Sequence, residues 1–467
     1  MDRRSARKLA NGVARRRKRA NQICAGLLAI TLTGCATVNS VSDSVLGTSK
    51  PVVGTPGFVS GFLGGVVADE PRAALAGREV LSTGGNAADA AVAVALTLSV
   101  TYPSRASLGG GGACLAYDPK RTGPNRGVPE AVLFLPPAPA HQGPGDRPAA
   151  VPMMARGLFA LHARYGKLPF EQFLASAEQL SRFGVTVSRA LARDLAVVAS
   201  PLSADPSAHA VFFQNGAPLG EGGTLVQPDL AATLSQLRTS GVGDFYQGAS
   251  SRKIADASVV AGGSFSPEDL RAALARLAPG VAVPAGRGDT AVFLPADADR
   301  GSVAAQAFQA LREHPGATPA SSVAGPLPAS TTFATLDRDG DAVVCALTMN
   351  NLFGTGRIAP GTGIVLAASP AAVPPPLLSA AMAYNGNLRA FRAEAGGSGQ
   401  EGAPLAAAYA LDQALADRSN PPRPMPNPVP EPGRANVIEC NRYLPEATGS
   451  CGWATDPRSA GLAVGSY

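Results

Sequence analysis

Residues 330–350 read STTFATLDRDGDAVVCALTMN, and this stretch indicates a pair of β-strands. The two arms, residues 331–336 and 342–350, are rich in threonine and apolar side chains. The turn signal Asp337-Arg338-Asp339-Gly340 separates them, as is typical of a β-hairpin. We therefore expect two antiparallel strands, the first of which begins near Ser330.

The chain upstream of this hairpin is mostly helical in pattern. Residues 70–82 have one apolar face and stop at a Gly-Gly pair, whereas residues 86–100 are apolar on every face, which predicts a core helix. Strand patterns lie at 113–117 and 131–135, and helix patterns at 153–165, 169–182 and 188–198. Residues 277–329 show no clear period.

Further strands are expected downstream of the hairpin at 363–368, 382–384 and 388–393, and a helix at 404–416. Residues 421–433 are rich in proline and are expected to form a linker. Helices, then strands, then a helix predict an α+β fold in which helices cover paired sheets.

The net charge of +6 is concentrated at the N-terminus. Residues 1–34 contain nine basic side chains and one acid, so the rest of the chain keeps 31 of the 40 basic and 33 of the 34 acidic residues. Because this remainder is close to neutral, the composition gives little support to a nucleic-acid partner.

The first 34 residues resemble a bacterial lipoprotein signal peptide. Basic residues precede an apolar stretch, 23–33, which is shorter than the roughly 20 residues needed to span a bilayer. The stretch ends in Leu32-Thr33-Gly34-Cys35, which looks like a lipobox with Cys35 as the lipidated residue. An ordinary secretory signal, or a buried thiol at Cys35, are the alternatives. Residues 35–64 are then expected to be a flexible tether to the periplasmic face, most simply of the outer membrane.

The other cysteines and the histidines carry no metal-ligand spacing, so no metal site is expected. Cys114 and Cys345 lie in apolar strand patterns, where buried free thiols are expected. Cys440 and Cys451 lie in a loop-rich region, and an oxidising periplasm favours a disulfide between them. The four histidines, at 141, 162, 209 and 314, are expected on the surface.

Several motifs, taken in order, resemble those of the γ-glutamyltransferase family. They are GGNAADAA at 84–91, LGGGG at 108–112, RYGKLP at 164–169, QPDLAATL at 227–234, STTFATLDRDG at 330–340, LTMN at 347–350 and FGTG at 353–356. The resemblance implies a four-layer αββα sandwich of the N-terminal-nucleophile hydrolase type. It also implies a large-subunit region, 65–329, and a small-subunit region, 330–467, which stay associated after the chain cuts itself.

In this family the first residue of the small subunit is the nucleophile, and its free α-amine is the base. An α-amine with a pKa of about 7.7–8.0 can accept a hydroxyl proton, so no histidine and no cofactor are needed. Aligning the motif without a gap places Ser330 at the nucleophile position, with Thr331 as the alternative. The same alignment makes Thr348 the threonine that orients the nucleophile and Asn350 a substrate contact.

Two further motifs are implied by the resemblance. Gly396 and Gly397, in the run Gly396-Gly397-Ser398-Gly399, resemble the family's glycine turn that stabilises the oxyanion. Ser379 lies in PLLSAAM, 376–382, which is a reduced form of the family's substrate-binding Pro-Leu-Ser-Ser-Met.

The chain departs from the family where the family binds the glutamyl head. The arginine that precedes the family's Ala-Pro pair is missing from FLPPAP, 134–139, and no acid follows the strand at 363–366. The first hypothesis is an enzyme that transfers or hydrolyses a γ-glutamyl group or a related small-molecule or peptide amide. The alternatives are an amidase with a non-glutamyl substrate and an inactive relative that serves as an envelope binding or structural protein.

Overall fold

The structure is a computed structural model that describes residues 51–466 except 123–126, 142–144, 300–301 and 315–328. The proposed signal peptide, Cys35 and most of the tether therefore lie outside the described residues. From Val53 onward the described chain forms one compact unit of helices and sheets.

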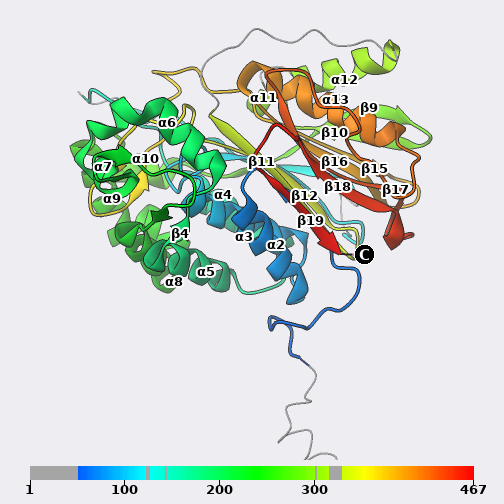
Figure 1. Ribbon diagram of the computed structural model, residues 1–467, viewed down its shortest axis with the longest axis horizontal. Helices are drawn as coiled ribbons and strands as arrows, with labels where there is room; N and C mark the ends of the chain where they lie inside the picture. The colour runs from blue at the N-terminus through cyan, green and yellow to red at the C-terminus, as the bar shows by residue number, and fades with distance from the viewer. Residues whose placement is uncertain (1–50, 123–126, 142–144, 300–301, 315–328, 467) are drawn as a thin grey trace, which may run out of the picture. The chain divides into compact units, whose positions relative to one another are not determined.

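Two antiparallel sheets lie face to face in the middle of this unit (Figure 1). In order across the first sheet, the strands are β19 (Leu462–Ser466), β1 (Gly64–Ala68), β11 (Ser330–Asp337), β12 (Ala342–Thr348), β2 (Gly111–Tyr117), β3 (Glu130–Phe134) and β8 (Arg276–Pro279). Those of the second are β18 (Cys451–Thr455), β17 (Arg434–Leu444), β16 (Ala390–Ser398), β15 (Ser379–Asn385), β10 (Asp289–Phe293) and β9 (Val281–Gly286).

Helices cover the outer face of each sheet (Figure 1). The helices of the first sheet's side are α2 (Pro71–Ser82), α3 (Ala87–Thr101), α4 (Met154–Tyr165), α5 (Phe170–Phe183), α6 (Arg189–Ser203), α7 (Pro206–Phe212), α8 (Pro228–Gln247), α9 (Ala249–Val260) and α10 (Pro267–Ala272). Those of the second sheet's side are α12 (Val303–Glu313) and α13 (Ala403–Ala416), whereas the short α11 (Ala296–Asp299) contributes Ala298 to the core between the sheets. Three hydrophobic cores fill the spaces between these four layers, which confirms the αββα sandwich.

The predicted hairpin is present as β11 and β12, and α3 is buried along its whole length as expected. Residues 277–329, which lack a sequence period, contain β9, β10, α11 and α12. The expected strand at 363–368 is only β14 (Ile364–Val365), paired with β13 (Ile358–Ala359). Residues 421–433 form no helix or strand, but Val429 is buried in the third core, so the segment packs on the fold rather than linking parts of it.

The prediction of free thiols at Cys114 and Cys345 is wrong, because the two form a disulfide. They lie directly opposite each other on β2 and β12, where side chains of an antiparallel pair come close together. The predicted Cys440–Cys451 disulfide is confirmed, although its cysteines lie in the paired strands β17 and β18 rather than in loops.

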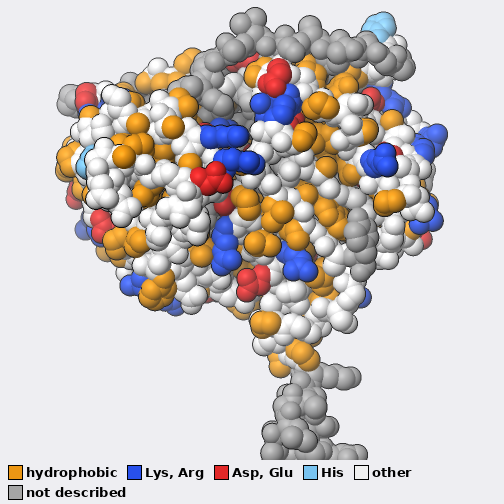
Figure 2. Space-filling model, viewed as in Figure 1, with side chains coloured by type: hydrophobic (Ala, Val, Ile, Leu, Met, Phe, Trp, Pro, Cys, Tyr) orange, Lys and Arg blue, Asp and Glu red, His pale blue; other side chains and the backbone are white. Residues whose placement is uncertain are grey.

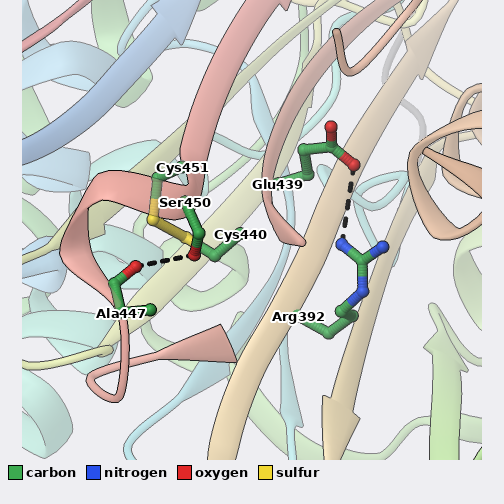
Figure 3. The surroundings of a disulfide bond; sticks show 6 residues. All are labelled: Arg392, Glu439, Cys440, Ala447, Ser450 and Cys451. Carbon is green, nitrogen blue, oxygen red and sulfur yellow. Dashed lines mark hydrogen bonds and ion pairs between the residues drawn. A yellow bond between two sulfur atoms is a disulfide. The ribbon is translucent and has the colours of Figure 1, made fainter. Parts of the chain in front are cut away.

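The Cys440–Cys451 disulfide lies beside a buried polar pair, Arg392 and Glu439 (Figure 3). Their closest nitrogen and oxygen atoms are 3.5 Å apart. Burial, followed by a hydrogen bond with Asp417, raises the pKa of Glu439 to about 9. At neutral pH the contact is therefore a long hydrogen bond to a neutral carboxyl rather than a full ion pair.

The prediction of four surface histidines is wrong for His162. Its side chain is only 14% exposed, packs against Phe170 and Phe173, and approaches Asp89 to 3.5 Å. The other three are exposed. Among the described residues, no group of three or more His, Cys, Asp or Glu side chains is placed to hold a metal ion, and no helix is long and apolar enough to cross a bilayer.

Glu394 of β16 is a carboxyl group in the core between the sheets. Its side chain is fully buried, neither oxygen has a hydrogen-bond partner among the described residues, and its cross-strand neighbours are Met382 and Ile438. Burial raises its pKa well above the usual 4.5. The folded protein therefore holds Glu394 as a neutral acid, and this favourable state is lost as the pH rises.

We expect Glu394→Gln to become more stable relative to the parent as the pH rises above about 4.5, by up to about 1.4 kcal/mol per pH unit. The neutral carboxyl contributes fully below the unfolded-state pKa, and ionisation opposes folding above it. Urea unfolding at several pH values checks this, with Glu221→Gln in an exposed turn as the control. Parallel pH profiles for the parent and Glu394→Gln would contradict the burial argument.

Candidate active site

Ser330 is the first residue of β11 and lies opposite Thr348 of β12. Side chains alternate along a strand, so Ser330 shares a face with Ala334 and Leu336, which belong to the core between the two sheets. Ser330 is fully buried, and its Oγ has no hydrogen-bond partner among the described residues. The Ser330 hydroxyl thus lies between the sheets and makes no hydrogen bond within the described part of the chain.

Thr331, the alternative nucleophile, points to the helical side of the sheet. Its Oγ1 donates to Asp69 Oδ2 over 2.9 Å, and the Thr332 N–H donates to the same oxygen over 3.0 Å. Asn436 of β17 donates to the other oxygen of Asp69 over 2.9 Å. The Thr331 hydroxyl is thus engaged in a buried network that joins the end of β1 to β11 and β17.

The carbonyl oxygen of Ala329, immediately before Ser330, accepts two hydrogen bonds from β12 and the residue after it. Thr348 Oγ1 donates over 3.0 Å and the Met349 N–H over 3.2 Å. The Thr348 hydroxyl accepts from the Asn350 N–H over 2.8 Å, which directs its own proton toward Ala329. Two donors on one carbonyl oxygen form the arrangement that stabilises a tetrahedral oxyanion.

Thr348 therefore lies where sequence reasoning placed it, opposite Ser330, but its hydroxyl contacts the Ala329 carbonyl rather than Ser330 Oγ. Two residues whose side chain or backbone contacts this region have positive φ angles. Asn350 has a φ of 59°, and Gln400, whose Oε1 accepts from the Ala329 N–H over 3.0 Å, has a φ of 54°. Positive φ at non-glycine residues costs about 1–3 kcal/mol each and clusters at functional sites.

Gly396 and Gly397 do not form the expected turn. Both are inside β16, paired with β15 on one side and β17 on the other. A Cβ on Gly396 would lie 2.7 Å from Thr332 Cβ, so glycine here allows the second sheet to approach β11. The turn follows at Gly399, where φ is 108°. Of the described residues, Thr348 and Met349 are the donors to the Ala329 carbonyl.

The two predicted substrate contacts are Asn350, which follows β12 in the first sheet, and Ser379, which begins β15 in the second sheet. Asn350 Nδ2 donates to the Ala368 carbonyl over 2.9 Å and to that of Pro136 over 3.4 Å. Ser379, opposite Gly397 at the start of β15, is buried, and its Oγ has no partner among the described residues. Ser379 and Ser330 are thus both buried hydroxyls with no described partner.

Sequence reasoning missed an ionic group on the other side of Ser330. Arg105, in the loop after α3, donates to the Ser330 carbonyl over 3.3 Å. The same guanidinium makes two hydrogen bonds of 2.8 Å with Asp194 of α6. The two residues lie 89 positions apart in the sequence, so no local spacing of residue types could have indicated that they form a pair.

The site also explains the glycines of the LGGGG run. A Cβ on Gly110 would lie 2.4 Å from the Thr348 carbonyl oxygen, and one on Gly112 would lie 2.4 Å from that of Ala346. Glycine is required because β12, which carries Thr348, passes too close for any side chain. Gly110 and Gly112 therefore pack directly against the backbone of the segment that carries Thr348.

Comparisons with known proteins identify relatives of this chain. The family model for gamma-glutamyltranspeptidase matches residues 73–327. The glutathione hydrolase proenzyme of Escherichia coli is 34% identical over 227 residues, which is 45% of this chain and 38% of that protein. The Bacillus subtilis glutathione hydrolase proenzyme is 32% identical over 225 residues, 44% of this chain and 37% of that protein. The chain thus matches less than two-fifths of these relatives' length.

A solved structure described as cephalosporin acylase from Bacillus halodurans has the same fold. It superposes with a TM-score of 0.70 over 87% of this chain and 96% of that one, at 18% identity. The layered sandwich, the order of the motifs and the match to more than half of the sequence lead to one conclusion: this chain belongs to the gamma-glutamyltranspeptidase family.

Proposed function

We propose that this protein is an acyl-transfer enzyme that matures by cutting its own chain between Ala329 and Ser330. The observation that carries the proposal is the Ala329 carbonyl, held by Thr348 Oγ1 and the Met349 N–H next to the unpartnered Ser330 Oγ. The two donors favour negative charge on this oxygen, which is the charge that develops when a nucleophile adds to the carbonyl.

The proposed cleavage proceeds through an ester. Ser330 Oγ forms a bond to the Ala329 carbonyl carbon, the Ala329–Ser330 C–N bond breaks, and the hydroxyl proton ends on the Ser330 nitrogen. Water then hydrolyses the ester, which leaves a carboxylate on Ala329 and a free α-amine on Ser330. That amine can serve as general base for Ser330 Oγ in later turnovers, because its ordinary pKa is near neutral.

Two observations support Ser330 over Thr331 as the nucleophile. The Ser330 hydroxyl lies on the face of β11 that packs against the second sheet. Thr331 lies on the opposite face, toward the helices, and donates to Asp69. If Thr331 were the nucleophile, it would attack the carbonyl of Ser330, the residue before it. Among the described side chains, the donor to that oxygen is Arg105 over 3.3 Å, and the pair of donors from Thr348 and Met349 is on the Ala329 oxygen instead.

We propose that the substrate is an amide of a small molecule or peptide, with a γ-glutamyl amide as the first candidate because of the named activity of the relatives. A non-glutamyl acyl group is the second candidate. It is favoured by the absence of an arginine in residues 134–139 and of an acid in residues 367–370, because a buried head group without partners costs binding energy.

We also propose that the protein is anchored by lipid at Cys35 and faces the periplasm. The basic, apolar and lipobox segments of residues 1–35 support this localisation. The two disulfides, Cys114–Cys345 and Cys440–Cys451, are compatible with an oxidising compartment. Metabolic labelling with a radioactive fatty acid tests it, with Cys35→Ser as the control.

Intact-mass measurement of the protein, produced from Ala36 onward, tests the cleavage and the nucleophile together. We expect two fragments that meet between Ala329 and Ser330, and a single uncut chain for Ser330→Ala. Thr331→Ala should still cut, with a loss of about 1–3 kcal/mol in stability because Asp69 loses a buried donor. The cut protein is then assayed with γ-glutamyl-4-nitroanilide. An uncut parent, or cleavage that survives Ser330→Ala, would overturn the proposal.

The rate of cleavage in Thr348 variants tests the oxyanion contact. Thr348→Val removes the hydroxyl at nearly constant volume and should slow cleavage by about 10²–10³, whereas Thr348→Ser should retain most of the rate. Thr335→Val is the matched control, because the buried Thr335 hydroxyl donates to Ala87 and Val343 instead. The time course on a denaturing gel measures the rate, and equal rates for the valine and serine variants would contradict the contact.

A further inference from the structure

The last residue before the proposed cut, Ala329, is held through both its N–H and its carbonyl group. The N–H donates to Gln400 Oε1 over 3.0 Å. The carbonyl oxygen accepts from Thr348 Oγ1 over 3.0 Å and from the Met349 N–H over 3.2 Å. Ala329 is therefore fixed from the first sheet through its carbonyl and from the segment after β16 of the second sheet through its N–H.

Gln400 lies in a turn of unusual backbone conformation. It begins the short helix η1 (Gln400–Gly402), which lies between β16 and α13. Its φ is 54°, a value that few non-glycine residues adopt, and the preceding Gly399 has a φ of 108°. A Cβ on Gly399 would lie 2.7 Å from the carbonyl oxygen of Pro432. Gln400 is only 7% exposed, so its contact with Ala329 is largely shielded from water.

On the proposed function, Ala329 marks the place of the substrate's acyl group. Self-cleavage passes through an ester between Ser330 Oγ and the Ala329 carbonyl carbon. Turnover passes through an ester between the same oxygen and the acyl carbon of the substrate. The two esters differ only in the acyl group that they carry. The groups that contact Ala329 before the cut are therefore the groups that face the substrate's acyl group once the Ala329 end has left.

The Gln400 contact distinguishes acyl groups by what stands on the carbon next to the acyl carbon. In Ala329 this carbon carries the N–H that donates to Gln400, and an N-acylated α-amino acid carries the same N–H. A γ-glutamyl group has a methylene there, and its α-amine is two carbons further on. With a γ-glutamyl group, Gln400 Oε1 would lose its donor in a buried site, which costs binding energy. Ala329 itself is fully buried, so a small side chain fits this place best.

The charged groups give no support to a charged acyl head. Residues 134–139 contain no arginine, and residues 367–370 contain no acid. On the described part of the face drawn in Figure 2, basic and acidic side chains lie next to one another near the middle rather than in a broad patch of one sign. Both observations favour an uncharged acyl group, which is recognised through peptide hydrogen bonds.

We propose that Gln400 recognises the acyl group and that the enzyme acts on amides of N-acylated small α-amino acids. Ser330 Oγ forms a bond to the acyl carbon, the C–N bond to the amine breaks, and the hydroxyl proton ends on the departing nitrogen. Water then hydrolyses the ester to the N-acylated amino acid and restores the hydroxyl. The inference rests on the function proposed above and favours its second candidate, a non-glutamyl acyl group.

Two anilides that differ at one position test the inference. They are N-acetyl-L-alanine 4-nitroanilide and O-acetyl-L-lactic acid 4-nitroanilide, in which an ester oxygen replaces the N–H. We expect the parent to have a kcat/KM about tenfold higher for the alanine anilide, the gain from one hydrogen bond, and to prefer it to γ-glutamyl-4-nitroanilide. Release of 4-nitroaniline measures all three rates.

Variants of Gln400 assign the preference to its side chain. Gln400→Met keeps the length of the side chain without the amide oxygen and should reduce the ratio of the first two kcat/KM values to about one. Gln400→Glu keeps an acceptor oxygen and should retain the preference. Glu401→Met changes the exposed neighbouring residue and is the matched control. A merely structural defect would lower both values and leave their ratio unchanged.

Self-cleavage gives a second readout and separates this inference from the proposed function. Gln400→Met should cut itself about tenfold more slowly than Gln400→Glu, because the Ala329 N–H loses its acceptor. Each variant is assayed on anilides once intact mass shows complete cleavage. An uncut parent would overturn the proposed function and this inference with it. A cut parent that turns over neither anilide or both equally, or a preference that survives Gln400→Met, would overturn this inference alone.

Discussion

The active-site geometry depends on the register between β11 and β12, in which Ser330 lies opposite Thr348. This pairing places the Ser330 hydroxyl between the sheets and brings the Ala329 carbonyl to Thr348 Oγ1 and the Met349 N–H. Because side chains alternate along a strand, a slip of one residue would exchange Ser330 for Thr331 and move the apolar residues of β11 to the wrong cores. The same burial that stabilises the sandwich therefore places the hydroxyl of Ser330, the proposed nucleophile, between the sheets.

The surroundings hold this register in several ways. The tight turn at residues 337–340 joins the two strands, and the Cys114–Cys345 disulfide joins β12 to β2 three residues before Thr348. Asp69 links β11 to β17 of the other sheet through Asn436. Glycines at 110, 112 and 396 allow strands to approach where a Cβ would collide. These contacts come from distant parts of the chain and converge on one pair of residues.

The sequence was sufficient for the parts of the fold that have a strong local pattern. The hairpin, the fully buried α3 and the helices α4 to α6 follow from periodicity and glycine positions, and the layered architecture follows from the family resemblance. The region at 277–329 could not be predicted, because β9 is an edge strand with alternating exposure and its partner β10 pairs with β15, far away in sequence. The Cys114–Cys345 disulfide and the Arg105–Asp194 pair likewise depend on register and packing between distant segments. The glycines at 396 and 397 were found as a motif, but their place inside a strand depends on both neighbours.

In the proposed cleavage, Ser330 Oγ attacks the Ala329 carbonyl and forms an ester. Hydroxylamine tests this most directly, because it cleaves an ester far faster than an amide and leaves a hydroxamate on the acyl residue. Freshly purified protein, produced from Ala36 onward, is treated with hydroxylamine, and the C-terminus of the large fragment is identified by mass spectrometry. We expect a hydroxamate on Ala329 in the parent and none in Ser330→Ala. A hydroxamate on another residue, or a chain that stays intact, would contradict it.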